Sequence, residues 1–272
     1  MPEFSAVLPM IVILLMIGGF AGVIGGMLGV GGGIVLVPAF YYAFTHLGYG
    51  GDQLMQMCVA TSLATIVVTS VRSVAAHHRK GAVDWAVLKG WGPFLVITAG
   101  AGVFVAARVS SMTLQAVFGV LAGLAGLWMA FGRDDWRVGQ TMPGQPVRGI
   151  LASVVGFLSA MMGIGGGTFG VPLMTAYNMP IHRAVATASG FGVLIAVPSV
   201  LGFLLVKIAD APPYTVGAVS LPAFLVVIGT TLITTPWGVR LAHAMNPKPL
   251  KRAFAVFLTL VALNMLRKVV GG

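Results

Sequence analysis

The sequence predicts an all-α polytopic membrane protein built from two inverted repeats of about five helical segments each, with a glycine-broken helical hairpin opening each repeat. Three observations lead to this prediction. The chain is 58% hydrophobic and only 8% charged, whereas a soluble domain has about 25% charged residues. Several apolar runs reach the roughly 20 residues that cross a bilayer. A glycine-rich stretch near the N-terminus recurs in the second half of the chain.

The repeated stretch occupies residues 22–38 and 156–172, and both copies carry Gly-x-Gly-Gly-Gly followed five residues later by proline. Glycine lowers helix stability by about 1 kcal/mol relative to alanine, so four glycines in five positions should interrupt a helix. In lipid, such a break is tolerated only where protein or a water-filled cavity covers it. A matching pair of glycine-interrupted apolar segments therefore points to the binding site of a transporter.

The apolar runs set the expected order of helical segments. Residues 33–45 would form only about 20 Å of helix, short of the ~30 Å hydrocarbon core, so 7–45 is expected to be a hairpin with its bend inside the membrane. We expect a first repeat over 1–132, a cytoplasmic linker over 133–146 and a second repeat over 147–272. The expected segments are 7–28, 33–45, 54–76, 86–107 and 112–132, then 147–163, 167–178, 183–206, 217–238 and 250–270.

Further matches extend the repeat beyond the glycines. Val59-Ala60-Thr61 matches Val185-Ala186-Thr187, and Gly81-Ala82-Val83 matches Gly217-Ala218-Val219. Five segments per repeat would invert the second copy, and this arrangement places most of the sixteen Lys and Arg residues on one side of the membrane. The positive-inside rule favours it over four segments. Both termini are then expected outside, on a multi-pass membrane protein.

Inversion would bring the two bends together near the midplane, with the short helices after them pointing their N-termini at one volume. A helix N-terminus carries roughly +0.5 charge and up to four unpaired N–H donors, and glycine lets an anion approach those donors. The alternative is that the glycines serve only close helix packing, which suits Gly18, Gly22 and Gly26 better. The substrate-binding candidates here are Gly31, Gly32, Gly33, Ile34, Gly165, Gly166, Gly167 and Thr168.

Hydroxyl side chains on the next spans form a second group of substrate-binding candidates. These are Thr61 and Ser62 in the first half and Thr187 and Ser189 in the second. A hydroxyl can donate to an oxyanion without bringing a charge into lipid. The alternative is that each hydroxyl bonds the carbonyl four residues earlier in its own helix.

Other function classes lack the residues that they need. Cys58 is the single cysteine, the five histidines sit near segment ends, where a solvated structural role is expected, and the six acids lie outside the middle of the apolar runs. We therefore expect no enzyme, no cofactor and no metal site.

The net charge of +10 is expected to orient the loops and contact anionic lipid headgroups, not nucleic acid. The other expected partners are a small anion and protons. Gly119, Gly123 and Gly126 could pack within one protomer or between protomers of a homo-oligomer.

The paired motifs resemble the TauE/SafE family of sulfite exporters and organosulfur-anion permeases. The residues that carry the resemblance are Gly29-x-Gly-Gly-Gly-x4-Pro38, Gly163-x-Gly-Gly-Gly-x4-Pro172, Ala60-Thr61-Ser62, Ala186-Thr187 and His77-His78-Arg79-Lys80-Gly81 with Val83-Asp84-Trp85. The resemblance spans essentially the whole chain and implies transport of small sulfur-containing anions across the inner membrane. This sequence departs from the repeat at Ala188, which stands where the first copy has Ser62.

The expected direction is export by alternating access around the midplane site. An anion that leaves a cell with a negative interior gains about 2.3 kcal/mol per charge per 100 mV. No carboxylate is placed for a proton relay within the apolar spans. An anion channel and a proton-coupled uptake permease for a related organic anion remain the alternatives.

Overall fold

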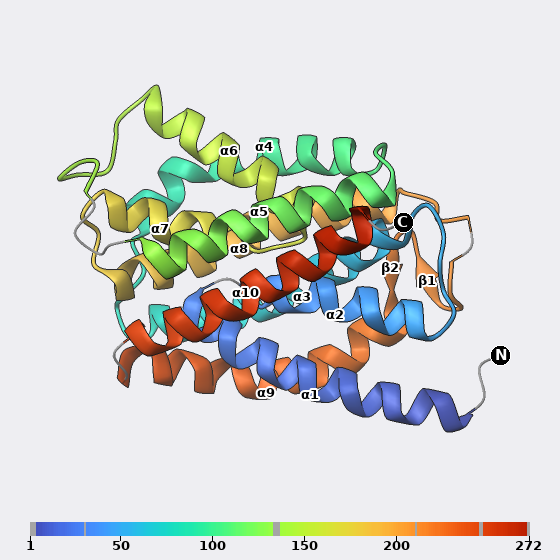
Figure 1. Ribbon diagram of the computed structural model, residues 1–272. Helices are drawn as coiled ribbons and strands as arrows, with labels where there is room; N and C mark the ends of the chain where they lie inside the picture. The colour runs from blue at the N-terminus through green and yellow to red at the C-terminus, as the bar shows by residue number, and fades with distance from the viewer. Residues whose placement is uncertain (1–3, 30, 133–136, 210, 245–246, 271–272) are drawn as a thin grey trace.

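The computed structural model describes residues 4–29, 31–132, 137–209, 211–244 and 247–270, and this part of the chain is an all-α bundle with one very short hairpin (Figure 1). The helices of the first half are α1 (Phe4–Leu28), α2 (Gly33–His46), α3 (Leu54–His78), α4 (Trp85–Ala106) and α5 (Ser111–Phe131). Those of the second half are α6 (Val147–Met162), α7 (Gly167–Ala176), α8 (Ile181–Leu204), α9 (Leu221–Ala244) and α10 (Pro247–Val270). The strands β1 (Thr215–Val216) and β2 (Val219–Ser220) pair antiparallel.

Six of the described helices are long and apolar enough to cross a membrane, namely α1, α3, α4, α5, α8 and α9. Outward-facing side chains such as Ile97, Phe104, Leu225 and Leu260 are large, apolar and more than half exposed. A soluble protein rarely exposes a continuous apolar surface of this kind, whereas lipid tails solvate it. The expected all-α polytopic membrane class is therefore confirmed.

One expected segment was wrong at its start. The sequence predicted a helix from residue 217, but Gly217 adopts φ +58 in the turn between β1 and β2. A side chain there would also lie 2.5 Å from the Leu204 backbone. A left-handed residue cannot continue a right-handed helix, so α9 begins only at Leu221 and runs on to Ala244.

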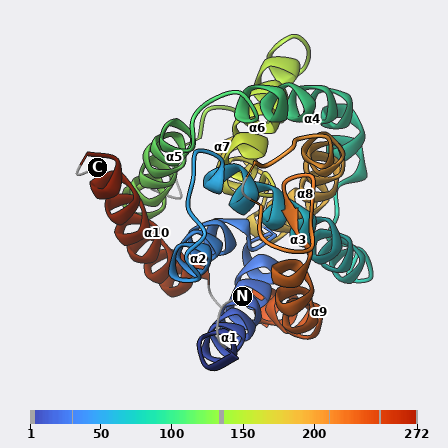
Figure 2. The same cartoon turned by 90° about the vertical axis from the view of Figure 1, so that its right-hand side faces the viewer.

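The helices are arranged as three outer pairs around a buried interior. Seen along the bundle, α1 lies beside α9, α4 beside α6 and α5 beside α10 (Figure 2). α3 and α8 pack against each other inside these pairs, and most residues of both are buried. The short helices α2 and α7 pack on α3 and α8 respectively.

Glycines allow the outer pairs to pack closely. A side chain at Gly22 would collide with Thr234 on α9, and one at Gly238 would collide with the Val23 carbonyl on α1. In the α4–α6 pair, Gly156 meets Thr98 in the same way and Gly102 meets the Phe157 carbonyl. The glycines at residues 18, 22 and 26 thus serve helix packing, and those at residues 119, 123 and 126 face α10 of the same chain.

The packing pairs follow the expected repeat. In the expected repeat, helices α1 to α5 correspond in order to α6 to α10. Exchanging each helix for its counterpart turns the pair α1–α9 into the pair α6–α4, and it leaves the pairs α3–α8 and α5–α10 unchanged. The α1–α2 hairpin opens at the end of the bundle where α1 starts and α10 ends, and the α6–α7 hairpin opens at the opposite end (Figure 1). Two inverted copies would produce this arrangement. The inverted repeat and its boundaries stay predictions, and part of the proposed linker, residues 133–136, lies outside the described residues.

Candidate functional site

Each glycine-rich bend ends one helix and starts a shorter one. Gly32 precedes α2 with φ +78, and Gly166 precedes α7 with φ +77, in the left-handed region that side chains rarely adopt. Both short helices begin on buried residues, Gly33 and Gly167. In α2 the backbone hydrogen bonds from Val35 and Leu36 go to the Gly32 carbonyl, so the N–H groups that precede them belong to the open first turn of the helix.

The two bends are in contact. A side chain at Gly33 would collide with the Gly163 carbonyl and lie 3.0 Å from Cα of Ile164. On the other side of the contact, a side chain at Gly163 would lie 2.9 Å from the Val37 side chain. Chain segments more than 120 residues apart thus touch inside the bundle, and the start of α2 lies against the bend that leads into α7.

Two buried hydroxyls near the bends have no hydrogen-bond partner among the described residues. Thr168 Oγ1 lies in the first turn of α7, and Ser70 Oγ lies on α3. Ser70 stands between the bends, because its Oγ would lie 3.1 Å from a Cβ at Gly31 and would collide with a Cβ at Gly192, which itself lies 3.4 Å from the Gly165 carbonyl. Buried polar groups are normally paired, so these two are available to a ligand.

The hydroxyl of Ser62 ties the two halves together. Its Oγ donates to the Gly163 carbonyl at 2.8 Å, and the side chain is fully buried. Ser189, by contrast, donates to the Ala186 carbonyl of its own helix at 2.6 Å. The departure at Ala188, noted from the sequence, therefore leaves the second half without a hydroxyl equivalent to that of Ser62.

The hydroxyls of Thr61 on α3 and Thr187 on α8 bond the backbone just before α9 and α4. Thr61 Oγ1 accepts the N–H of Ser220 at 3.0 Å, and Thr187 Oγ1 accepts the N–H of Asp84 at 2.9 Å. Asp84 also caps α4 by accepting from Ala86 and Val87. In this conformation both hydroxyls hold backbone groups at helix starts. The segments that carry them touch the bends, since Val59 lies against Gly163 and Val185 against Gly29. The role of all twelve candidates in substrate binding stays a prediction.

Other buried donors near α7 were missed by the sequence reasoning. The indole of Trp91 stacks on Phe191 with ring centroids 5.3 Å apart, and its Nε1 has no partner within the described ranges. The Phe191 ring in turn lies 2.9 Å from a Cβ built on Gly170 of α7. Ser159 Oγ on α6 is also buried and unpaired there. Ser70 could have been found, because Ser62, Ile66 and Ser70 recur every four residues and so share one face of α3.

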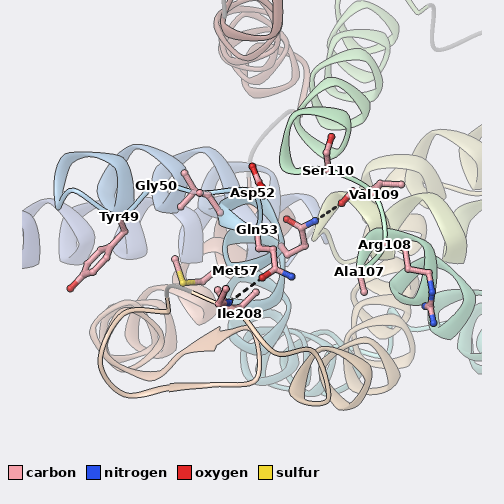
Figure 3. A pocket seen from close by; sticks show the side chains of 14 residues that line it. Tyr49, Gly50, Asp52, Gln53, Met57, Ala107, Arg108, Val109, Ser110 and Ile208 are labelled. Atoms are coloured by element: carbon pink, nitrogen blue, oxygen red, sulfur yellow. Dashed lines mark hydrogen bonds between the residues drawn. The ribbon is translucent and has the colours of Figure 1, made fainter.

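A cavity of about 610 Å³ opens elsewhere, at the end of the bundle where the loop before α3, the loop after α4 and the segment after α8 meet (Figure 3). Gln53 Oε1 accepts the Ala209 N–H at 3.2 Å, and Gln56 Nε2 donates to the Val109 carbonyl at 2.7 Å. These two hydrogen bonds link the start of α3 and the loop before it to the segment after α8 and to the loop after α4. None of the predicted site residues lines this cavity.

The described residues contain no group of three or more His, Cys, Asp or Glu side chains placed to hold a metal ion. The polar groups at and near the bends are the backbone amides of the helix starts, the hydroxyls of Thr168 and Ser70 and the indole of Trp91. All of them can donate hydrogen bonds. Such a set can bind an anion without a fixed positive charge.

Comparison with known proteins gives the wider context. Over 262 residues the chain is 29% identical to a probable membrane transporter protein of Haemophilus influenzae, which covers 95% of this chain and 98% of that protein. A probable membrane transporter protein of Methanocaldococcus jannaschii is 25% identical over 97% of both chains. One from Bacillus subtilis is 31% identical over 65% of this chain and 72% of its own. No solved structure matches significantly.

These relatives and the six apolar helices of the described residues indicate a multi-pass membrane transporter. The profile described as "Sulfite exporter TauE/SafE" matches residues 14–265. The matched region contains both glycine bends and all ten helices in whole or in part. The chain therefore belongs to the TauE/SafE sulfite exporter family.

Proposed function

We propose that this protein is a secondary transporter that exports small sulfur-containing anions, such as sulfite or an organosulfonate, across the inner membrane by alternating access. The substrate would bind at the glycine bends, with its oxygens facing the starts of α2 and α7. The observation that carries the proposal is the contact of Gly33, the first residue of α2, with Gly163 and Ile164 of the second glycine bend, a few residues before the start of α7.

The unpaired hydroxyls support an anionic ligand at the bends. Thr168 Oγ1 and Ser70 Oγ are buried and lack partners among the described residues. An unpaired buried polar group costs roughly 1–3 kcal/mol, so a ligand that accepts hydrogen bonds would recover that free energy. A sulfur oxyanion offers several acceptor oxygens, and the two helix dipoles favour its negative charge.

The close contact of the bends also supports alternating access. In this conformation the bend residues from Gly31 to Ile34 and from Gly163 to Thr168 are buried. A substrate can enter only if the helices that carry the bends separate on one side. Separation first on one side and then on the other is the motion expected of two hairpins that enter from opposite ends.

The placement of the described acids favours export without a carboxylate relay. Asp84 caps α4 and pairs with Arg183 at 3.0 Å, and Asp52 lies in the loop before α3. Both are at the ends of the bundle. The outward-directed force on an anion in a cell with a negative interior is about 2.3 kcal/mol per charge per 100 mV, which suffices for export.

The test is flux in proteoliposomes with sulfite, thiosulfate, sulfate, a sulfonate and a carboxylate. We expect saturable counterflow with at least one sulfur anion, and faster net efflux when a potassium diffusion potential makes the vesicle interior negative. Ion conductance that does not saturate and shows no counterflow would instead identify a channel. Counterflow restricted to the carboxylate would overturn the proposed substrate class.

A further inference from the structure

Three histidines from three helices meet at the end of the bundle where α3 stops. His77 is fully buried, His243 on α9 is half-buried and His182 on α8 is exposed. The His77 and His243 rings have centroids 5.2 Å apart, and the His182 ring is stacked on His243 at 5.8 Å. The sequence indicated solvated histidines at segment ends, and for His77 that expectation was wrong.

The hydrogen bonds of His77 define where its protons are. Its Nε2 lies 3.3 Å from the Gly26 carbonyl, and its Nδ1 lies 3.1 Å from Nε2 of His243. A carbonyl oxygen can only accept, so Nε2 of His77 carries a hydrogen. The contact between the two rings needs one hydrogen between its nitrogens. In the neutral pair, His243 therefore donates its Nε2–H to Nδ1 of His77.

The pair can take up one more proton but not two. With one extra proton, His77 carries hydrogens on both nitrogens and donates to a His243 whose hydrogen has moved to Nδ1. With two extra protons, both facing nitrogens carry hydrogens and the contact breaks. Lys80 and His182 interact electrostatically with both rings of the pair. The nearby carboxylate of Asp84, just before α4, does not offset them, because it is already paired with Arg183. The positive charge of Lys80, and that of His182 when it is protonated, opposes a second proton.

The site is connected to the first hairpin. Gly26, whose carbonyl His77 holds, stands three residues before the bend glycine Gly29. A side chain at Gly26 would collide with the Thr235 carbonyl of α9, so the same turn of α1 contacts both α9 and His77. A charge on buried His77 is unfavourable, and a protonated pair would therefore favour a conformation in which this turn opens to water.

We propose that the His77–His243 pair is a proton-binding site, reached from solvent through His182, whose occupancy by one proton weakens the packing of the first hairpin against α3 and α9. Proton binding would thereby be coupled to the opening of the transport site. This coupling rests on the proposed function, whereas the proton site itself does not.

The proton site can be tested without any substrate. ¹⁵N-histidine NMR of the full chain in nanodiscs, with resonances assigned by single His→Gln variants, reports tautomer and protonation of each ring. We expect His77 in the Nε2–H form near neutral pH, and uptake of one proton shared by the two rings on acidification. Exposed His46, at the end of α2, provides a reference resonance from outside the pair. Independent titration of His77 and His243 would overturn the proton site.

Transport then tests the coupling. In His77→Gln the amide can still donate to Gly26 and accept from His243, but it cannot titrate. We expect anion counterflow at equal pH to persist, while stimulation of net flux by a pH gradient falls roughly fivefold or more. His46→Gln should change neither. His243→Gln provides the same test if His77→Gln does not fold.

The possible failures are distinguishable. If the wild-type protein shows no counterflow with any anion, the proposed function fails, the coupling fails with it, and the NMR titration still decides the proton site. If counterflow is normal but His77→Gln and His243→Gln both keep the full response to a pH gradient, the coupling is overturned while the proposed function stands.

Discussion

Ser62 Oγ donates a 2.8 Å hydrogen bond to the carbonyl of Gly163, and this bond joins the central helix of the first half to the glycine bend of the second. Both groups are buried. The bond holds the end of α6 against α3 at the point where Gly33 also touches it. The geometry of the bend therefore depends on a side chain from the other half of the protein.

Replacing Ser62 with Ala should destabilise the protein, because the Gly163 carbonyl would lose its donor inside the bundle. The expected loss is about 1–3 kcal/mol, measured as a lower midpoint of thermal unfolding in detergent. Ser189→Ala is the matched control, since its hydroxyl bonds only the Ala186 carbonyl of its own helix. That control should change stability by less than about 0.5 kcal/mol. Equal losses in the two variants would contradict a special role for Ser62.

Replacing Gly33 with Ala should impair transport more than it impairs folding. The added Cβ would meet the Gly163 carbonyl and the Ile66 side chain, and would push the two bends apart. We expect a loss of counterflow of roughly tenfold or more, equivalent to about 1.4 kcal/mol. Gly229→Ala, on α9, has nothing within 4 Å of the added atom and should retain full counterflow. Normal activity of Gly33→Ala would argue against a site at the contact.

Replacing Thr168 with Val removes the unpaired hydroxyl while keeping the shape of the side chain. If the hydroxyl donates to the substrate, the half-saturation concentration for counterflow should rise roughly ten- to a hundredfold, since one hydrogen bond to an anion is worth roughly 1.5–3 kcal/mol. The folded protein should not be destabilised, because the hydroxyl has no partner among the described residues. Thr168→Ser should restore substrate affinity. Unchanged affinity in the valine variant would remove Thr168 from the site.

Thr61 and Thr187 should behave as a matched pair in stability measurements. Each accepts a backbone N–H just before a helix, from Ser220 and Asp84 respectively. Thr61→Val and Thr187→Val should each cost about 1–2 kcal/mol of unfolding free energy. Substrate affinity, measured by counterflow, should stay within about twofold of wild type. A large change in affinity without loss of stability would instead support the sequence-based assignment of both as substrate ligands.

The glycine bends show how far local sequence reasoning reaches. The apolar runs and glycine triplets predicted the ends of α2 and α7 to within two residues, because membrane spans depend on local hydropathy and breaks depend on local backbone preference. The same reasoning failed at residues 217–220, where a left-handed Gly217 and the Ser220–Thr61 bond delay the start of α9. A contact between residues 159 positions apart leaves no local signal.

The sequence by itself determined the membrane class, the helical segments and the doubled bend, because each follows from residues that are neighbours in the chain. Tertiary structure alone decided which buried hydroxyls form hydrogen bonds within the protein and which have no partner among the described residues. Ser62, Thr61 and Thr187 look alike in sequence, yet one bonds a bend and two bond helix starts. Tertiary structure also buried His77 against Gly26 and His243. The physical reason is that hydrogen-bond partners are set by distances between packed helices, which hydropathy and periodicity do not encode.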